Sequence, residues 1–119
     1  MPRRMSFAMT TEQAWSRTKT VTRRKGWGFL RPGDVVQQVE KGMGLKKGEK
    51  QRKIHLIRIV SNVPEPLSDM IWNPVYGKSE CVKEGFPDKS PRWFLDMYCR
   101  HNNVTIHDPQ NRIEFEYLE

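Results

Sequence analysis

A short run near the N-terminus gathers the side chains best suited to chemistry. Residues 17–24, with the sequence RTKTVTRR, hold four cationic side chains and three hydroxyls around a single valine. Cationic and hydroxyl side chains can contact phosphate and sugar oxygens. The run also supplies a Lys/Thr pair, because a threonine hydroxyl becomes a nucleophile once a base removes its proton. Lysine acts as that base when burial or a nearby cation lowers its pKa.

This run should enter an extended segment, because threonine and valine favour strands. It does not have the composition of a central strand, since Val21 is its only apolar residue. A second interpretation is a solvated edge strand whose charges prevent pairing with another sheet edge. The residues alone leave both interpretations open.

The net charge of +7 is unevenly distributed along the chain. Residues 1–53 contain 14 Lys and Arg against 4 Asp and Glu, whereas residues 54–119 contain 7 against 10. A basic half is the expected footprint of a polyanionic partner, because each neutralised phosphate releases condensed counterions. Residues 41–53 are rich in Gly and Lys and predict a long exposed loop suited to backbone contacts without sequence readout. The alternative is a surface that is basic without any partner.

Length and composition exclude several classes of protein. A chain of 119 residues is enough for one compact domain. It has no apolar run of the ~20 residues that a transmembrane helix needs, and its N-terminus lacks the apolar core of a signal peptide. Cys81 and Cys99 lack a Cys-x-x-Cys spacing, and the three histidines are scattered. We therefore expect a cytoplasmic protein with reduced thiols and no metal or cofactor.

Four segments have the pattern of strands: residues 5–9, 35–40, 54–60 and 112–118. The third is apolar at most positions and predicts a strand buried on both faces, which Pro64 and Pro66 then end. In the last strand, Ile113, Phe115 and Tyr117 alternate with glutamates and should face inward.

Helices are expected at two places. Residues 10–18 form a short helix capped by Thr10, with Ala14 and Trp15 on its inner side. Ser90 caps a later helix that has proline at its first position. The apolar side chains of this helix recur at helical spacing, which is typical of core residues rather than of a ligand site: Trp93, Phe94, Met97 and Tyr98.

A turn and a single helical turn complete the expected elements. Residues 31–34, with the sequence RPGD, form the turn, and residues 67–71 form the helical turn. Residues 72–83 have no clear pattern. Several strands with two or three short helices define the α+β class and predict a small mixed β-barrel.

The order of several sequence blocks resembles the ASCH family, whose barrel is related to the PUA fold. The blocks cover nearly the whole chain: RTKTVTRR at 17–24, LRPGD at 30–34, VEKGMGLKKGE at 39–49, EGFP at 84–87 and IEFEY at 113–117. The chain is most similar to the short stand-alone ASCH proteins of bacteria and their phages. This resemblance implies binding of RNA or a nucleobase in a cleft beside a PUA-like barrel.

The resemblance also implies an activity and three site residues. Small bacterial ASCH enzymes that hydrolyse N4-acetylcytidine use a Lys, a Thr three residues later and a Glu before the late helix. Lys19, Thr22 and Glu84 match these positions here. A nearby carboxylate would raise the pKa of Lys19 and oppose its use as a base. Residues three apart in a strand face opposite sides, so Lys19 and Thr22 can converge only across a bend or a helix-to-strand junction.

The ligand-binding residues are expected mainly in the basic half. The ligand would be RNA, another single-stranded nucleic acid or a modified nucleoside, contacted by Arg17, Thr20, Arg23, Arg24, Trp27, Lys41, Lys46, Lys47 and Lys53. Trp27 lies between two glycines and is either a stacking platform for a base or a lid over the barrel core.

Four functions are therefore open. The leading hypothesis is binding of a nucleobase or short strand in a basic cleft. The alternatives are an amidohydrolase that deacylates cytidine, a metal-independent ribonuclease and a protein-interaction adaptor. An adaptor would expose an apolar patch of several hundred Å², and the sequence offers no obvious one.

Overall fold

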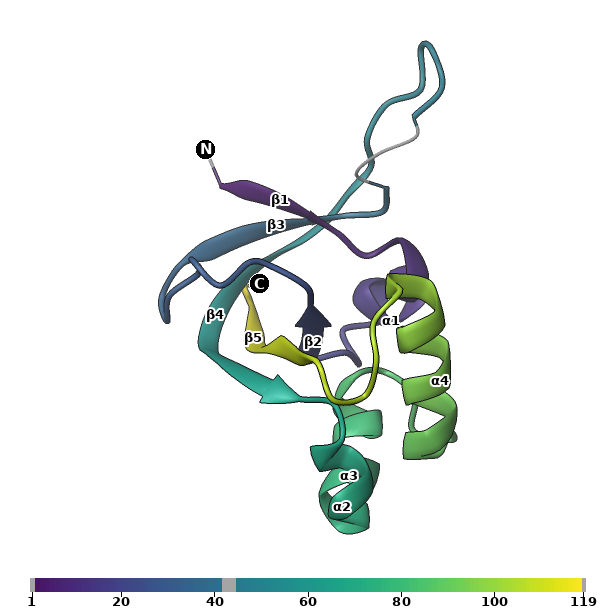
Figure 1. The fold of residues 1–119 in the computed structure, drawn as a ribbon. Coiled ribbons are helices and arrows are strands. Elements are labelled where there is room, and N and C mark those ends of the chain that lie inside the picture. The colour runs from purple at the N-terminus through teal and green to yellow at the C-terminus, as the bar shows by residue number, and fades with distance from the viewer. Residues whose placement is uncertain (1, 42–44, 119) are drawn as a thin grey trace.

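Five strands form one sheet that curls into half a barrel (Figure 1). The computed structural model describes residues 2–41 and 45–118, so residues 42–44 of the expected loop lie outside the described part. The strands are β1 (Arg3–Ser6), β2 (Val21–Arg24), β3 (Val35–Val39), β4 (Lys53–Pro66) and β5 (Pro109–Leu118). Their order in space is β1-β3-β4-β5-β2. Together with the short helices, this sheet confirms the predicted α+β class.

β4 organises the sheet, because it pairs with β3 over its first half and with β5 over most of its length. β1 runs parallel to β3, and the other neighbouring strands are antiparallel. Register shifts between Gln37 and Val39 and between Ile59 and Ser61 interrupt the pairing, and such bulges bend a sheet. The buried cluster of the half-barrel comprises Met5, Phe7, Ala14, Leu30, Val36, Ile57, Ile59, Ile113 and Phe115.

β4 is buried on one face only, so the prediction of a strand buried on both faces is wrong. Ile57 and Ile59 are buried, whereas Leu56 and Val60 are 39% and 44% exposed. Successive side chains of a strand point to opposite faces, and an antiparallel sheet commonly packs on one of them. The apolar residues of the outer face therefore meet solvent.

Pro64 and Pro66 do not end β4, contrary to the prediction. They pair with Asn111 and Pro109 of β5, so the strand continues past both prolines. The pairing of β4 with β3 stops at Arg58, and beyond it the strand has β5 as its one partner within the described residues. A proline lacks the N–H that a second neighbour would need, and an edge tolerates this loss.

The N-terminal strand lies earlier in the chain than predicted. β1 ends just before Phe7, and a 3-10 helix, η1 (Ala8–Thr10), leads into α1 (Thr11–Trp15). The partner strand β3 ends at Val39, whose carbonyl accepts a bond from the Phe7 N–H at 2.8 Å. Without a longer partner strand, the chain leaves the sheet at this point and turns into helix.

Helix α1 has only part of its predicted geometry. Ala14 is buried as predicted, but Thr10 makes no side-chain capping bond and Trp15 is exposed. The Trp15 indole donates to Glu40 at 2.6 Å, and its ring meets His55 edge to face with centroids 5.6 Å apart. Neighbouring residues of an α-helix point about 100° apart around its axis, so Trp15 lies outside the side that buries Ala14.

Three helices pack together beside the sheet: α2 (Asp69–Trp72), α3 (Pro74–Lys83) and α4 (Pro91–Asn102). Ser90 accepts a bond from the Trp93 N–H at 3.1 Å, which confirms the predicted cap of α4. Phe94 and Tyr98 are buried as predicted, whereas Trp93 is exposed. The helices share a second apolar cluster: Leu67, Met70, Cys81, Phe94, Leu95 and Tyr98.

Helix α3 occupies most of the segment that had no clear pattern in the sequence. Asn73 caps it by accepting a bond from the Tyr76 N–H at 3.2 Å, and Pro74 follows at the first helical position. This is the same cap-proline signal as in α4. The apolar periodicity is weak because Val75 and Val82 face solvent.

Cys81 and Cys99 are both free thiols. Among residues 2–41 and 45–118, no helix combines the length and the apolar character that a bilayer crossing requires. In the same part of the chain, no group of three His, Cys, Asp or Glu side chains is arranged to hold a metal ion.

Gly77 is a point of close approach between α2 and α3, because a Cβ there would collide with the Met70 carbonyl. We expect Gly77→Ala to lower the free energy of unfolding by ~1–3 kcal/mol, since a backbone carbonyl cannot move aside as a flexible side chain can. Chemical denaturation measures this loss. The matched control is Ser79→Ala, at an exposed position of the same helix, with an expected change below about 0.5 kcal/mol. Equal stability of the two variants would show that the helices do not pack this closely.

Candidate functional site

A cavity of about 170 Å³ lies between the half-barrel and α4. Its lining comes from the β1–η1 segment, the residues leading into β2, β2 itself, the chain after α3, and α4. The lining residues are Ser6, Phe7, Ala8, Met9, Thr10, Lys19, Thr22, Arg23, Arg24, Glu84, Phe86, Phe94, Met97, Tyr98, His101 and Asn102. The three residues that the resemblance assigned to catalysis are among them.

Lys19 and Thr22 reach the cavity across a helix-to-strand junction. The chain turns after α1 at Arg17, which has a left-handed backbone conformation with φ of 63°. The Thr20 N–H then bonds the Lys83 carbonyl at 2.8 Å, which ties the junction to the end of α3. Because residues three apart in a regular strand face opposite sides, this junction allows both side chains to line one cavity.

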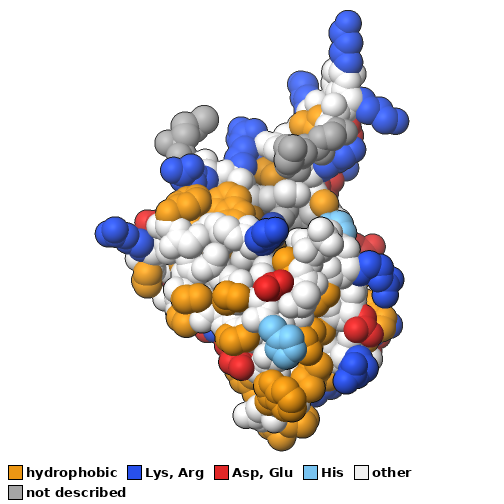
Figure 2. All heavy atoms as spheres, in the orientation of Figure 1, with side chains coloured by type: hydrophobic (Ala, Val, Ile, Leu, Met, Phe, Trp, Pro, Cys, Tyr) orange, Lys and Arg blue, Asp and Glu red, His pale blue; other side chains and the backbone are white. Residues whose placement is uncertain are grey.

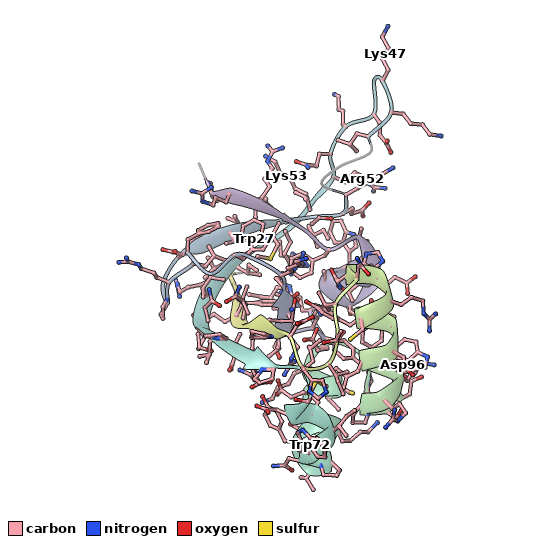
Figure 3. All side chains as sticks on the ribbon, in the orientation of Figure 1. Trp27, Lys47, Arg52, Lys53, Trp72 and Asp96 are labelled. Carbon is pink, nitrogen blue, oxygen red and sulfur yellow. The ribbon has the colours of Figure 1, made fainter. Side chains whose placement is uncertain are left out.

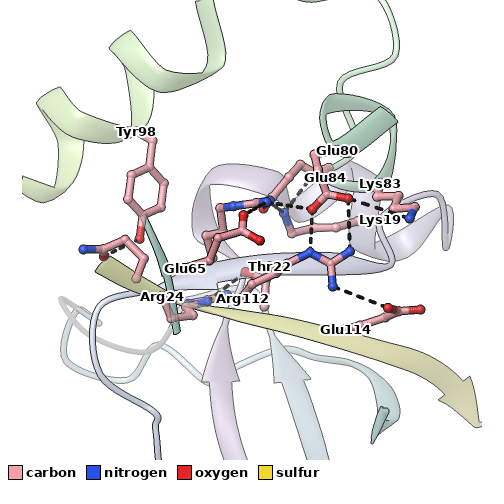
Figure 4. Close-up of polar contacts among 12 residues, drawn as sticks. Lys19, Thr22, Arg24, Glu65, Glu80, Lys83, Glu84, Tyr98, Arg112 and Glu114 are labelled. Atoms are coloured by element: carbon pink, nitrogen blue, oxygen red, sulfur yellow. Dashed lines mark hydrogen bonds and ion pairs between the residues drawn. The ribbon is translucent and has the colours of Figure 1, made fainter. Parts of the chain in front are cut away.

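Glu84 lies directly after α3 and holds two cations at once (Figure 4). Its Oε1 accepts a bond from Lys19 Nζ at 2.6 Å, and its backbone carbonyl accepts from the same ammonium at 3.0 Å. Its Oε2 accepts from Arg23 Nη1 at 2.9 Å. The next residue, Gly85, has φ of 100°, and a Cβ there would come within 2.6 Å of Gln13. A glycine therefore suits the turn that follows Glu84.

Arg23 lies in β2 and is surrounded by carboxylates. Its Nη1 bonds Glu84, and its Nη2 donates to Glu80 at 2.7 Å and to Glu65 at 2.9 Å. The residue is 3% exposed. Both terminal nitrogens are engaged inside the protein, so Arg23 supports Glu84.

Glu80 and Arg112 complete this ion network, and sequence reasoning missed both. Glu80 is fully buried and accepts two bonds from Arg112, at 2.6 and 3.0 Å (Figure 4). Burial raises the pKa of Glu80, but its hydrogen bonds with Arg112 and Arg23 and their charges outweigh this effect and lower the pKa to about 2. One sequence signal could have indicated Glu80: it lies four residues before Glu84, a spacing that puts two side chains on one face of a helix.

Burial lowers the pKa of Lys19 from its ordinary value of 10.5. Lys19 is only 2% exposed, and desolvation disfavours its charged form. Glu84 raises the pKa, as expected of a neighbouring carboxylate, whereas Arg24 and Arg23 lower it further. Burial outweighs the carboxylate, so Lys19 loses its proton more readily than a lysine in water.

Arg24 lines the cavity beside Thr22. Its Nε donates to Thr22 Oγ1 at 3.0 Å, and its guanidinium carbon lies 4.8 Å from the centre of the Phe7 ring. Burial lowers the pKa of Arg24 to about 10, although the charges of Glu84 and Tyr98 oppose this shift. Because Thr22 Oγ1 accepts a bond from Arg24, its own proton is free for another acceptor.

Aromatic rings form much of the remaining lining. The helical spacing predicted that two of them are core residues and not part of a ligand site. Phe94 and Tyr98 belong to the second apolar cluster and also line the cavity. The Tyr98 hydroxyl donates to Gln110 at 2.8 Å, which fixes the ring above the site (Figure 4). Helical spacing alone cannot separate the two roles, because one ring serves both.

Several of the sequence-predicted binding residues lie away from the cavity. Trp27 packs against the barrel cluster, with its ring centroid 5.5 Å from that of Phe29, and its carbonyl accepts a bond from Asn62. This is the position of a lid over the core rather than of a stacking platform at the cavity. Arg17 is exposed beside the junction, and the backbone of Thr20 bonds Lys83 and Phe115.

A long projection runs from the end of β3 to the first residue of β4, and we call it the basic arm (residue 41 and residues 45–53). It contains Lys41, Lys46, Lys47 and Lys53. Figure 3 shows that it stands away from the half-barrel, with Lys47 at its tip and Arg52 and Lys53 nearer its root. Lys46 and Glu49 close the tip through two bonds of 2.8 Å. Apart from the partly buried Gln51, all described residues of the arm are exposed.

A second, shallower hollow lies near α2, lined by Glu65, Asp69, Trp72, Asn73 and Tyr76. Glu65 accepts bonds from Arg23 and from the Tyr76 hydroxyl, so its charge is already engaged. Trp72 projects from this end of the molecule (Figure 3). It and Val75 are exposed apolar side chains that the sequence did not indicate. The cavity beneath α4 offers more groups for chemistry and is the candidate site.

Comparisons of the chain with protein-family profiles, with curated proteins and with solved structures found no significant match.

Proposed function

We propose that the protein binds a single nucleobase, carried on a nucleoside or a strand, in the cavity beneath α4. The resemblance to ASCH proteins implies such a ligand, and one observation supports it above the others. The cavity has the size of one ring, with both aromatic side chains and hydrogen-bond donors in its lining.

The volume favours a single ring. A protein cavity of about 150 Å³ holds a benzene molecule, and the cavity here measures about 170 Å³. Phe7, Phe94 and Tyr98 present apolar surfaces to it. Stacking on such side chains stabilises a bound base by ~1–3 kcal/mol.

The polar groups favour a base with a carbonyl oxygen. Lys19, Thr22 and Arg24 all carry N–H or O–H donors and line the cavity. Both carboxylate oxygens of Glu84 already accept bonds from cations, so the charged groups of the site offer a ligand mainly donors. A pyrimidine such as cytosine or uracil has a ring carbonyl that matches this arrangement.

We expect the wild-type protein to bind cytidine or N4-acetylcytidine. The affinity should fall about 3- to 10-fold in Thr22→Val, because this variant loses one hydrogen bond to the ligand. Isothermal titration calorimetry measures both affinities. Thr20→Val is the matched control, since it makes the same substitution two residues away and outside the cavity lining. The proposal fails if no pyrimidine nucleoside binds, or if the two variants lose affinity equally.

A second candidate is hydrolysis of the acyl group of an N4-acylated cytosine, the activity that the resemblance implies. The lowered pKa of Lys19 favours it, because a neutral amine can remove the Thr22 proton. Thr22 Oγ1 would attack the acyl carbonyl, N4 would leave with a proton, and water would hydrolyse the acyl-threonine. Lys19 Nζ contacts Glu84 and Thr22 Oγ1 contacts Arg24, so the base–nucleophile bond would form when the ligand enters.

A further inference from the structure

The root of the basic arm lies beside the cavity. Phe7, which lines the cavity, bonds the carbonyl of Val39 at the end of β3. The Glu40 N–H bonds the carbonyl of Arg52 at 2.9 Å and closes the root of the arm. The arm therefore begins at Lys41, two residues after Val39, the strand end whose carbonyl accepts a bond from the cavity wall.

Charge on the arm is almost entirely positive. Its described residues include six cations and one acid: Lys41, Lys46, Lys47, Lys50, Arg52 and Lys53, with Glu49. Lys41 approaches Glu49 at 3.7 Å and Arg52 approaches Glu40 at 3.8 Å, in exposed pairs that water and salt screen. Figure 2 shows the blue side chains of the arm standing clear of the body of the molecule. Such a surface fits a partner with repeated negative charges.

A nucleic-acid strand fits the arm and the cavity together. Its phosphates repeat along the chain and suit cations spread along an extended arm, while one of its bases suits a ring-sized cavity. An anionic membrane would favour apolar residues beside the cations, and Leu45 is the one large apolar side chain among the described arm residues. A base inside a duplex would first have to leave its stack to enter the cavity, which favours a single strand.

We infer that the ligand of the cavity is presented on a single-stranded nucleic acid, whose phosphates farther along the strand from the inserted base bind the arm. This inference rests on the proposed function, and adds that the arm distinguishes a strand from a free nucleoside. Neutralising the arm should therefore weaken strand binding and leave nucleoside binding unchanged.

The test compares two triple variants of equal net charge. Lys46→Gln/Lys47→Gln/Lys50→Gln removes three of the six described cations of the arm, and Arg31→Gln/Arg58→Gln/Arg92→Gln removes three exposed charges elsewhere on the molecule. Fluorescence anisotropy measures binding of a labelled pyrimidine-rich single-stranded oligonucleotide over a series of salt concentrations, with cytidine and N4-acetylcytidine as competitors. Calorimetry measures binding of the nucleosides alone.

In the arm variant we expect oligonucleotide affinity to fall at least tenfold. The slope of log affinity against log salt should shrink by about 2, because three contacts with single-strand phosphates are lost. Nucleoside affinity should stay within about twofold of wild type. The inference is overturned if the two triple variants lose equal affinity for the oligonucleotide, or if nucleosides fail to compete with it. It is also overturned if the arm mediates binding to phosphatidylserine vesicles and the protein does not bind the oligonucleotide. If wild type binds neither nucleoside nor oligonucleotide, the proposed function itself fails.

Discussion

Replacing Glu80 with glutamine is expected to lower the free energy of unfolding by ~3–5 kcal/mol. Glu80 is fully buried and bonds both Arg23 and Arg112, and glutamine keeps its shape while removing the charge. Two guanidinium groups would then lose the carboxylate they share. Urea denaturation at neutral pH measures the difference.

The matched control is Glu114→Gln, which also removes a carboxylate beside Arg112. That contact is 3.5 Å long and the Glu114 side chain is 41% exposed, so we expect a loss below about 1 kcal/mol. Similar losses in the two variants would contradict a buried network centred on Glu80.

The same network implies a defined pH dependence of stability. Glu80 has its pKa lowered to about 2 in the folded state, against about 4.3 for an unfolded glutamate. The stabilisation is therefore present above about pH 4.3 and is lost as the pH falls toward 2. Denaturation series from pH 7 to pH 2 should show this loss in wild type and a smaller one in Glu80→Gln.

Lys19→Met is expected to give the largest effect on activity, a fall of ~10²–10⁴-fold in kcat/KM for hydrolysis of N4-acetylcytidine. The substitution keeps the length of the buried side chain and removes the amine that would take the Thr22 proton. Glu84 keeps its bond to Arg23, so the fold should survive, and circular dichroism checks this. Chromatographic separation of cytidine from its acetylated form measures the rate.

Lys25→Met controls for the loss of a positive charge nearby, because Lys25 is exposed and lies outside the cavity lining. The wild-type rate should also rise with pH, with a midpoint below 10.5, because the neutral form of Lys19 is the active one and burial lowers its pKa. Unchanged turnover in Lys19→Met, or a rate that falls as the pH rises, would exclude Lys19 as the base.

The elements that were predicted correctly depend on sequence patterns only a few residues long. The Ser90 cap with its proline and the alternation of Ile113 and Phe115 each appear in the structure as expected. The strand at residues 54–60 extends to Pro66 because β5 pairs with it to that point. Residues 109–111 of β5 are distant in sequence, so no local pattern shows this extension. Likewise, the exposure of Trp15 depends on contacts with Glu40 and His55, which no local pattern encodes.

The site was only partly predictable for the same reason. The resemblance placed Lys19, Thr22 and Glu84, but nothing local indicates that a charged run becomes buried. β2 is an edge strand paired with β5, as the second interpretation held, yet residues 21–23 are buried and Arg24 is partly buried, so the strand is not solvated. Carboxylates that lie 42 to 65 residues away in sequence bind Lys19 and Arg23, and that pairing exists only in the folded chain.

The most direct measurement is a nuclear magnetic resonance titration of methyl-labelled protein with a pyrimidine nucleoside. We expect the methyl signals of Thr22 and Met97, which line the cavity, to shift together and saturate with one dissociation constant. The methyl signals of Val75, on the exposed end of α3, should stay in place. Shifts that leave Thr22 and Met97 unaffected, or that spread without saturation, would contradict a base bound beneath α4.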